Sequence, residues 1–205
     1  MPNQTFYNLT ATKKNRIIDA IIDECAIHTF EHINLSNIVR DAQIPRGSFY
    51  QYFVDKRDVF DFLYTHIGVL KMQFIGNLMD PQLDIPFLKR FERIYLSGLD
   101  FAQAHPKLMK AGQKMIESEL FKENDMMKKA TQSAIDFYVN FIKIDQEKGY
   151  IRKNIDPSLL ATVMIEFSNK VSLAEYMKEN VDRSTVEHAV KGLIDLIQKG
   201  IENHV

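Results

Sequence analysis

The sequence predicts an all-α protein, and three observations carry this prediction. Glycine (8) and proline (6) are few among the 205 residues, and the prolines lie outside the long stretches of chain or at their starts. Within those stretches apolar residues recur at spacings of three and four, which is the period of an amphipathic helix. No segment shows the alternating pattern of a strand. We expect about nine helices from these periodic stretches.

Four of the expected helices lie in the first 79 residues. The first carries its isoleucines on one face and its charged residues on the other. Asn34 can cap the second helix, Gln43 to Pro45 break the chain, and a third short helix follows. Asp55, with Asp58 three residues later, forms a variant of the capping box and opens the fourth. These helices are expected over 12–28, 35–42, 46–53 and 55–79.

Five more helices are expected in the remainder of the chain. Pro106 and Pro157 are suited to the first turn of a helix, and Gly149 to the position after a last turn. Asp182 and Ser184 mark the beginning of the final helix. The five are expected over 86–104, 106–118, 123–148, 157–179 and 184–203.

Composition restricts the class of protein. With 26 Lys and Arg against 27 Asp and Glu, 45% hydrophobic and 26% charged residues, the chain resembles an ordinary soluble globular protein. Its single cysteine, Cys25, cannot form an internal disulfide or a multi-cysteine zinc site. The N-terminus has no leader pattern, and the uncharged runs are far shorter than the roughly 20 residues of a membrane span. We expect a cytoplasmic protein.

The second and third helices, separated by a three-residue turn, have the dimensions of a helix-turn-helix. Phe49 and Phe53 are four residues apart and are expected to face the core. This arrangement predicts an outward face on the third helix, formed by Arg46, Ser48, Tyr50, Gln51 and Tyr52.

Side chains on this face suit contact with DNA. Arg46 and Gln51 can read base edges, because a guanidinium pairs with guanine and an amide with adenine. Ser48 and Tyr50 offer hydroxyl donors to phosphate, and Lys56 adds a charge at the start of the next helix. Gly47, which lacks a side chain, allows close approach of the backbone.

The run from Ile38 to Phe53, followed by Asp55 and Lys56, resembles the DNA-binding signature of the tetracycline-repressor (TetR) family of transcriptional regulators. The segment around Gly149 resembles the family's lead into its dimerisation helices. The resemblance implies a DNA-binding domain at 1–54 and an effector-binding and dimerisation domain at 55–205, joined by the fourth helix. It also implies a homodimer that binds DNA. The expected DNA-binding residues are Asn34, Ser36, Arg46, Gly47, Ser48, Tyr50, Gln51, Tyr52 and Lys56.

The chain departs from the family pattern at three positions. Gln43 and Thr29 occupy positions where the family often has glycine, and a left-handed backbone there costs roughly 1 kcal/mol. Pro45 replaces the common hydroxyl cap of the third helix. The first 60 residues hold seven basic and seven acidic side chains, so DNA affinity must depend on placed residues rather than on bulk charge.

Two further sites are expected in the C-terminal part. Aromatic and methionine stripes on successive helices are typical of packing, and they also suit a pocket for an apolar or amphipathic small molecule. The effector-binding candidates are Phe91, Tyr95, Met115, Phe137, Phe141 and Phe167. The last two helices carry apolar faces suited to close helix approach, and the resemblance favours a dimer interface there. Its candidates are Leu160, Val163, Val186, Val190, Leu193, Ile197 and Ile201.

The sequence therefore predicts a ligand-responsive regulator, a repressor, that binds a palindromic operator as a homodimer and is released by a small effector. A helical interaction protein of the same fold, acting through a protein partner, is the alternative. His28 and His32 match the H-x-x-E-H zinc-peptidase pattern, but the first helix is expected to end between them. We expect no enzyme activity, no metal and no cofactor.

Overall fold

The computed structural model describes residues 1–123, 125–176 and 182–201. Within these ranges it holds eleven α-helices, two short 3-10 helices and no strand, so the all-α prediction is confirmed. The two helices beyond the expected nine are short ones. The chain forms two compact units, residues 1–72 with 104–124 and residues 73–103 with 125–205.

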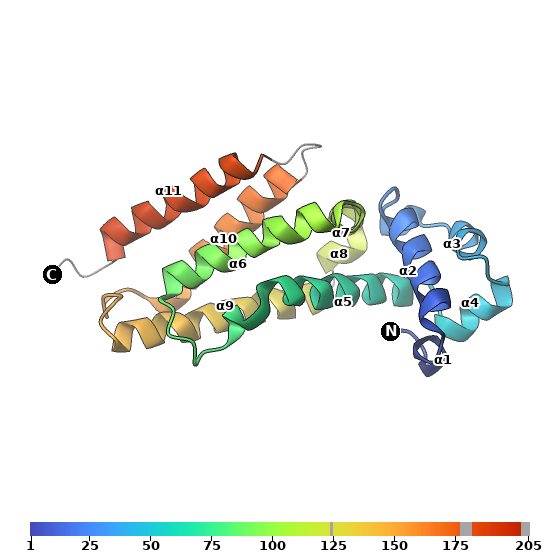
Figure 1. Ribbon diagram of the computed structural model, residues 1–205, viewed down its shortest axis with the longest axis horizontal. Helices are drawn as coiled ribbons and strands as arrows, with labels where there is room; N and C mark the ends of the chain where they lie inside the picture. The colour runs from blue at the N-terminus through green and yellow to red at the C-terminus, as the bar shows by residue number, and fades with distance from the viewer. Residues whose placement is uncertain (124, 177–181, 202–205) are drawn as a thin grey trace. The chain divides into compact units, whose positions relative to one another are not determined.

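The first unit contains the helix-turn-helix. Its core is formed by fully buried residues from several helices, among them Ile17, Ile21, Ile38, Phe49 and Phe53. In Figure 1, α3 and α4 lie beside α2, and α5 follows α4 along the chain. The elements are α1 (Gln4–Tyr7), α2 (Ala11–Cys25), η1 (Phe30–His32), α3 (Leu35–Asp41), α4 (Arg46–Tyr52), α5 (Lys56–Ile75), α7 (Pro106–Glu117) and α8 (Glu119–Glu123). The last residues of α5 belong to the second unit.

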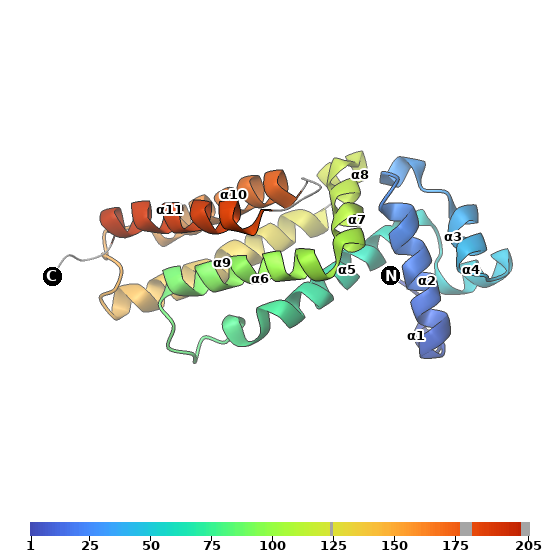
Figure 2. The same cartoon turned by 45° about the horizontal axis from the view of Figure 1, so that its top comes forward.

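The second unit is a helical bundle whose core receives side chains from four helices. Both views show α10 and α11 side by side (Figure 2). No helix in the described ranges is long and apolar enough to cross a membrane. The elements are η2 (Gly76–Met79), α6 (Phe87–Ala104), α9 (Asp125–Glu147), α10 (Pro157–Tyr176) and α11 (Arg183–Ile201).

Several helix ends follow from local chemistry that the sequence predicted. The Asn34 side chain accepts a hydrogen bond from the Ser36 amide at 2.9 Å, and the Asp55 carboxylate accepts one from the Asp58 amide at 3.0 Å. The helix expected to reach residue 79 instead ends at Ile75, because Gly76 adopts a left-handed φ of 56°. The chain then continues as 3-10 helix η2.

Gln43 and Thr29, which occupy positions where the family often has glycine, differ in backbone conformation. Gln43 has a φ of 52° and is the one non-glycine residue with positive φ in the described part of the chain, as expected. Thr29 has a φ of −67°, so the expectation of a left-handed backbone there is wrong. The chain avoids the strain at residue 29 by ending α2 at Cys25 and continuing to the 3-10 turn η1.

Candidate functional site

The helix-turn-helix is held in place by a buried carboxylate that the sequence reasoning missed. Glu24, on α2, is only 6% exposed. Its two oxygens accept hydrogen bonds from the Asn34 amide at 2.7 Å and from the Asn37 side chain at 3.1 Å. Because both partners lie at the start of α3, Glu24 fixes that helix against α2. A buried acid on an apolar helix face is the signal that could have revealed this contact.

The turn between α3 and α4 is closed by backbone hydrogen bonds. The Gln43 amide donates to the Arg40 carbonyl at 3.0 Å and the Ile44 amide to the Val39 carbonyl at 3.2 Å. Pro45 precedes α4 without a side-chain cap. The first turn of α4 therefore keeps amide groups that no capping side chain satisfies, which suits contact with a phosphate.

The outer face of α4 agrees with the prediction at most positions. Arg46, Gly47, Tyr50 and Gln51 are exposed, and Ser48 is half-buried. We call these five residues the reading face. Phe49 and Phe53, on the opposite side, are buried as expected.

Tyr52 was expected on the reading face, and that prediction is wrong. Its side chain is only 4% exposed. The Phe6 ring lies 6.3 Å from the Tyr52 ring and the Lys13 ammonium 5.7 Å from it. The short helix α1, which has too few residues for a periodic signal, covers this position.

Residues 3–6 also bind the end of α4. The Thr5 hydroxyl and the Asn3 side chain donate to the Gln51 carbonyl, and the Asn3 amide donates to the Tyr52 carbonyl at 2.8 Å. The last carbonyls of a helix lack partners within it. Residues 3–6 therefore complete α4 and hold it in position.

Three expected DNA-binding residues lie outside α4. Ser36 is exposed at the start of α3, and its hydroxyl accepts a long contact of 3.5 Å from the Arg46 guanidinium. Asn34 is exposed, and its side chain caps α3. Lys56 is half-buried, and its ammonium donates to the Glu31 carbonyl at 3.3 Å. The structure thus brings Ser36 and Arg46 together and leaves Lys56 with a weak neutral partner.

The histidines of the H-x-x-E-H pattern do not share a helix. α2 ends at Cys25, before His28, and His32 lies in η1. The His32 ring contacts the Thr29 hydroxyl at 3.0 Å. Within the described residues, no group of three or more histidine, cysteine or acidic side chains is arranged to hold a metal.

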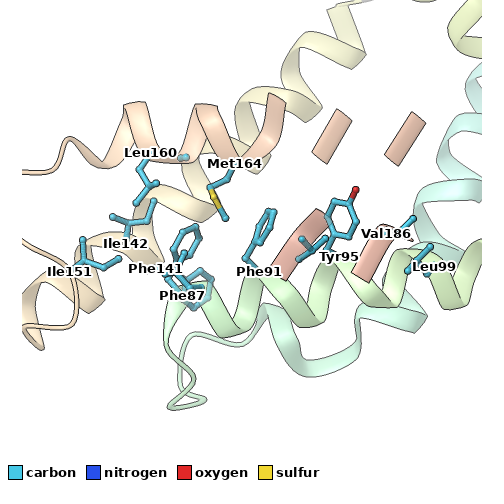
Figure 3. Packing of buried hydrophobic residues seen from close by; sticks show 13 residues of the cluster. Phe87, Phe91, Tyr95, Leu99, Phe141, Ile142, Ile151, Leu160, Met164 and Val186 are labelled. Carbon is cyan, nitrogen blue, oxygen red and sulfur yellow. The ribbon is translucent and has the colours of Figure 1, made fainter. Parts of the chain in front are cut away.

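Five of the six effector candidates lie in one cluster of the second unit. Their contacts include Phe137 with Phe141 at 4.6 Å and Phe91 with Tyr95 at 5.9 Å between ring centroids. Phe167 lies 6.3 Å from Tyr95. Figure 3 shows side chains of this core between the helices. Met115, the sixth, is buried in the first unit.

The aromatic cluster contains a buried cation that the sequence analysis did not single out. Arg90 on α6 is 1% exposed, and its guanidinium lies 4.0 Å from the centre of the Phe141 ring. Nη1 donates to the carbonyls of Leu78 and Asp80, and Nη2 to that of Leu83 at 2.7 Å. Nε has no hydrogen-bond partner. Burial lowers the pKa of Arg90.

A buried acid lies on the facing helix. Asp145 on α9 is 5% exposed, and its carboxylate accepts a hydrogen bond from the Phe87 amide at 2.7 Å. Burial raises the pKa of Asp145, although this amide and the nearby charges of Lys148 and Arg90 act in the opposite direction. The carboxylate therefore fixes the first turn of α6.

Each unit has a hollow among its described residues. A groove of about 710 Å³ in the first unit is bordered by α2, α5 and the start of α7, including Ile22, His66 and Leu108. A smaller pocket of about 200 Å³ in the second unit is bordered by Pro86, Asp145 and other residues near the ends of α6 and α9. Neither is bordered by a predicted effector residue.

The expected dimer residues are divided between core and surface. Leu160, Val186 and Val190 are buried in the core of their own bundle, so they have no surface to offer a second copy. Val163 is 46% exposed, and Leu193 and Ile197 are half-buried. The side chain of Ile201 lies outside the described residues. Two exposed leucines that the prediction omitted, Leu159 and Leu196, lie on the same two helices.

Comparisons with known proteins identify the fold. No protein-family model matches the chain. YhgD of Bacillus subtilis strain 168, named an uncharacterised HTH-type transcriptional regulator, is 22% identical over 196 residues, covering 94% of this chain and 98% of that protein. A TetR-family transcriptional regulator from Chloroflexus aurantiacus J-10-FL superposes with a TM-score of 0.76 at 20% identity over 100% of both chains.

A third protein of similar structure has a ligand. The transcriptional regulator FadR from Bacillus subtilis, solved in complex with stearoyl-CoA, superposes with a TM-score of 0.72 at 13% identity over 92% of this chain and 99% of that one. The chain has the fold of the TetR-family transcriptional regulators. The resemblance indicated by the helix-turn-helix sequence is thereby confirmed at the level of the fold.

Proposed function

We propose that this chain is a ligand-responsive transcriptional regulator, a repressor, that binds a palindromic operator as a homodimer and leaves it when a small effector binds. The reading face of α4 carries the proposal. Arg46, Tyr50 and Gln51 are exposed on a helix whose other side is fully packed. Guanidinium and amide groups held in this way suit direct reading of base edges in a major groove.

We place DNA binding in residues 1–54, with Lys56 at the start of α5 as a phosphate contact. Two reading faces in a dimer must meet two grooves, so the half-sites are expected about one helical turn apart. For the dimer we take the exposed apolar residues Leu159, Val163 and Leu196 as the contact surface, together with the half-buried Leu193 and Ile197. An isologous contact of this kind pairs the same surface in both copies.

The effector is proposed to be apolar or amphipathic and to act in the aromatic cluster. The cluster's lining of phenylalanine and tyrosine favours such a molecule, and the related FadR binds stearoyl-CoA. α5 begins directly after the helix-turn-helix and ends in the second unit, so it can carry a change from the cluster to the reading face. A coupling of roughly 1–3 kcal/mol corresponds to a 5- to 150-fold loss of operator affinity.

A binding selection on random duplexes tests the proposal. We expect it to enrich a symmetric motif, and Lys56→Ala to weaken binding to all sequences about equally because a phosphate contact carries no sequence information. Selected pools without any common motif would contradict the regulator function and favour an interaction protein of the same fold.

A further inference from the structure

Arg90 has an unusual environment for a charged side chain. It is almost fully buried, and among the described residues it forms no ion pair with a carboxylate. Its charge is solvated by three neutral carbonyl groups, and the Nε donor has no acceptor. A buried cation without an ion pair, and a buried donor without an acceptor, are both unfavourable. The nearby charges of Asp145 and Asp80 offset only part of the cost of burying the guanidinium. The bundle therefore contains a position where an anion would be stabilised.

This position adjoins the apolar effector candidates. The guanidinium stacks on Phe141, which contacts Phe137, and the Phe91 side chain belongs to the same core. A molecule lying among these rings would have an apolar environment along its length and a cation at one end. Hydrogen bonds from a guanidinium to an anion are roughly twice as strong as those to a neutral acceptor, so a carboxylate would compete effectively with the carbonyls.

We propose that Arg90 binds the carboxylate of an amphipathic effector whose apolar chain lies among the aromatic side chains of the bundle. This inference rests on the proposed function, because it names the chemical class of the effector. An uncharged effector leaves the Arg90 guanidinium without an ion pair, and a cationic effector is repelled by it. The site therefore selects a fatty-acid-like anion over neutral and cationic molecules of equal length.

Asp145 opposes the binding of such an anion. Its carboxylate lies on the helix facing Arg90, and the two groups interact electrostatically. When Asp145 is ionised, its negative charge disfavours a second anion near the same guanidinium. Asparagine in its place removes this charge and keeps an oxygen that can accept from the Phe87 amide. Affinity for the carboxylate is then expected to rise.

The Arg90 contacts also suggest how the effector would act. The three carbonyls that it binds belong to Leu78 in η2 and to Asp80 and Leu83 in the segment that follows. This segment joins the end of α5 to α6. A carboxylate that takes over part of the guanidinium therefore weakens the contacts that hold the segment at the end of α5.

Direct binding of matched probes to the full chain without DNA tests this inference. The probes are dodecanoate, dodecanol and dodecylammonium, each below its aggregation concentration, measured by displacement of a polarity-sensitive fluorophore. For the wild type we expect dodecanoate to bind at least about tenfold more tightly than dodecanol, with dodecylammonium the weakest, because only the carboxylate gains a charge-assisted hydrogen bond.

Two variants and a control test whether the preference for dodecanoate over dodecanol depends on Arg90. Arg90→Met should reduce the preference for dodecanoate to less than about threefold, and Asp145→Asn should raise dodecanoate affinity about threefold or more without changing that of dodecanol. Lys89→Met, which removes the exposed neighbouring cation, should leave the preference unchanged. Circular dichroism checks that each variant is folded. If Arg90→Met does not fold, Asp145→Asn decides the question.

Equal affinity of the wild type for dodecanoate and dodecanol would overturn the Arg90 site and leave the proposed regulator intact. The same holds if Lys89→Met abolishes the preference, or if Asp145→Asn leaves dodecanoate affinity unchanged. Failure of all three probes to bind would remove both the Arg90 site and the apolar effector from the proposed function. DNA binding, measured separately, would be unaffected by that result.

Discussion

The reading face of α4 and the aromatic cluster of the second unit differ in exposure and in how much their side chains contribute to packing. Arg46, Tyr50 and Gln51 are exposed, and the packing of α4 does not need them. Phe91 and Phe141 are 1% and 3% exposed, and the bundle cannot pack without them. Function on the surface helix can therefore be separated from stability by substitution, whereas in the bundle the same side chains serve both.

Among substitutions by alanine, Phe141→Ala is expected to give the largest effect and to sharpen this contrast. The substitution removes a ring packed against Phe137 and Arg90, and truncation of a buried phenylalanine typically lowers the free energy of unfolding by about 3–5 kcal/mol. Tyr50→Ala, on the exposed face, should change it by no more than about 0.5 kcal/mol. Urea denaturation measures both. An equal loss of unfolding free energy in Phe141→Ala and Tyr50→Ala would mean that the two regions do not differ as described.

A second contrast divides the residues of α11. Val190 is fully buried in its own bundle and Leu196 is 73% exposed. Val190→Glu is expected to prevent folding, because an unpaired buried carboxylate costs several kcal/mol. Leu196→Glu should leave the helical content unchanged and convert the proposed dimer to monomer.

Sedimentation equilibrium at micromolar concentration, with circular dichroism, measures both outcomes. A dimeric Leu196→Glu protein would remove Leu196 from the proposed dimer surface. A wild type that sediments as a monomer would overturn the dimer itself.

Gly47→Ala should give a small gain in stability together with a loss of DNA binding. A Cβ atom added at Gly47 meets no other atom within 4 Å, and alanine in a helix is more favourable than glycine by roughly 0.5–1 kcal/mol. We therefore expect a slight rise in the free energy of unfolding together with weaker operator binding, since the new methyl group occupies space that DNA approaches. Thermal denaturation and operator titration, run in parallel, check the two signs. Unchanged operator affinity would mean that the backbone at Gly47 does not approach DNA.

The sequence could predict elements whose signals are local. Asn34, Asp55 and Gly149 mark helix ends because a cap or a left-handed residue acts within a few positions of itself. The positive φ of Gln43 was indicated by the family resemblance, since the family usually has glycine at this position of the turn. The long helices followed from periodicity, which accumulates over many residues.

The remaining features depend on contacts between distant parts of the chain. Helix α1 has four residues, too few for a periodic pattern, and without it Tyr52 was placed on the surface. Glu24 and Arg90 are buried because their partners lie in other elements. An apolar stripe on α11 does not reveal whether it packs on its own bundle or on a second copy, which is why Val186 was assigned to the dimer surface.

The most direct test of the central claim, that α4 reads bases, compares duplex selections by the wild type and by Gln51→Ala. We predict that both proteins enrich the same symmetric motif, and that the variant loses preference at one position in each half-site. Loss of a bidentate amide contact corresponds there to about 1–3 kcal/mol of discrimination. Identical motifs with identical preferences at every position would contradict base reading by α4.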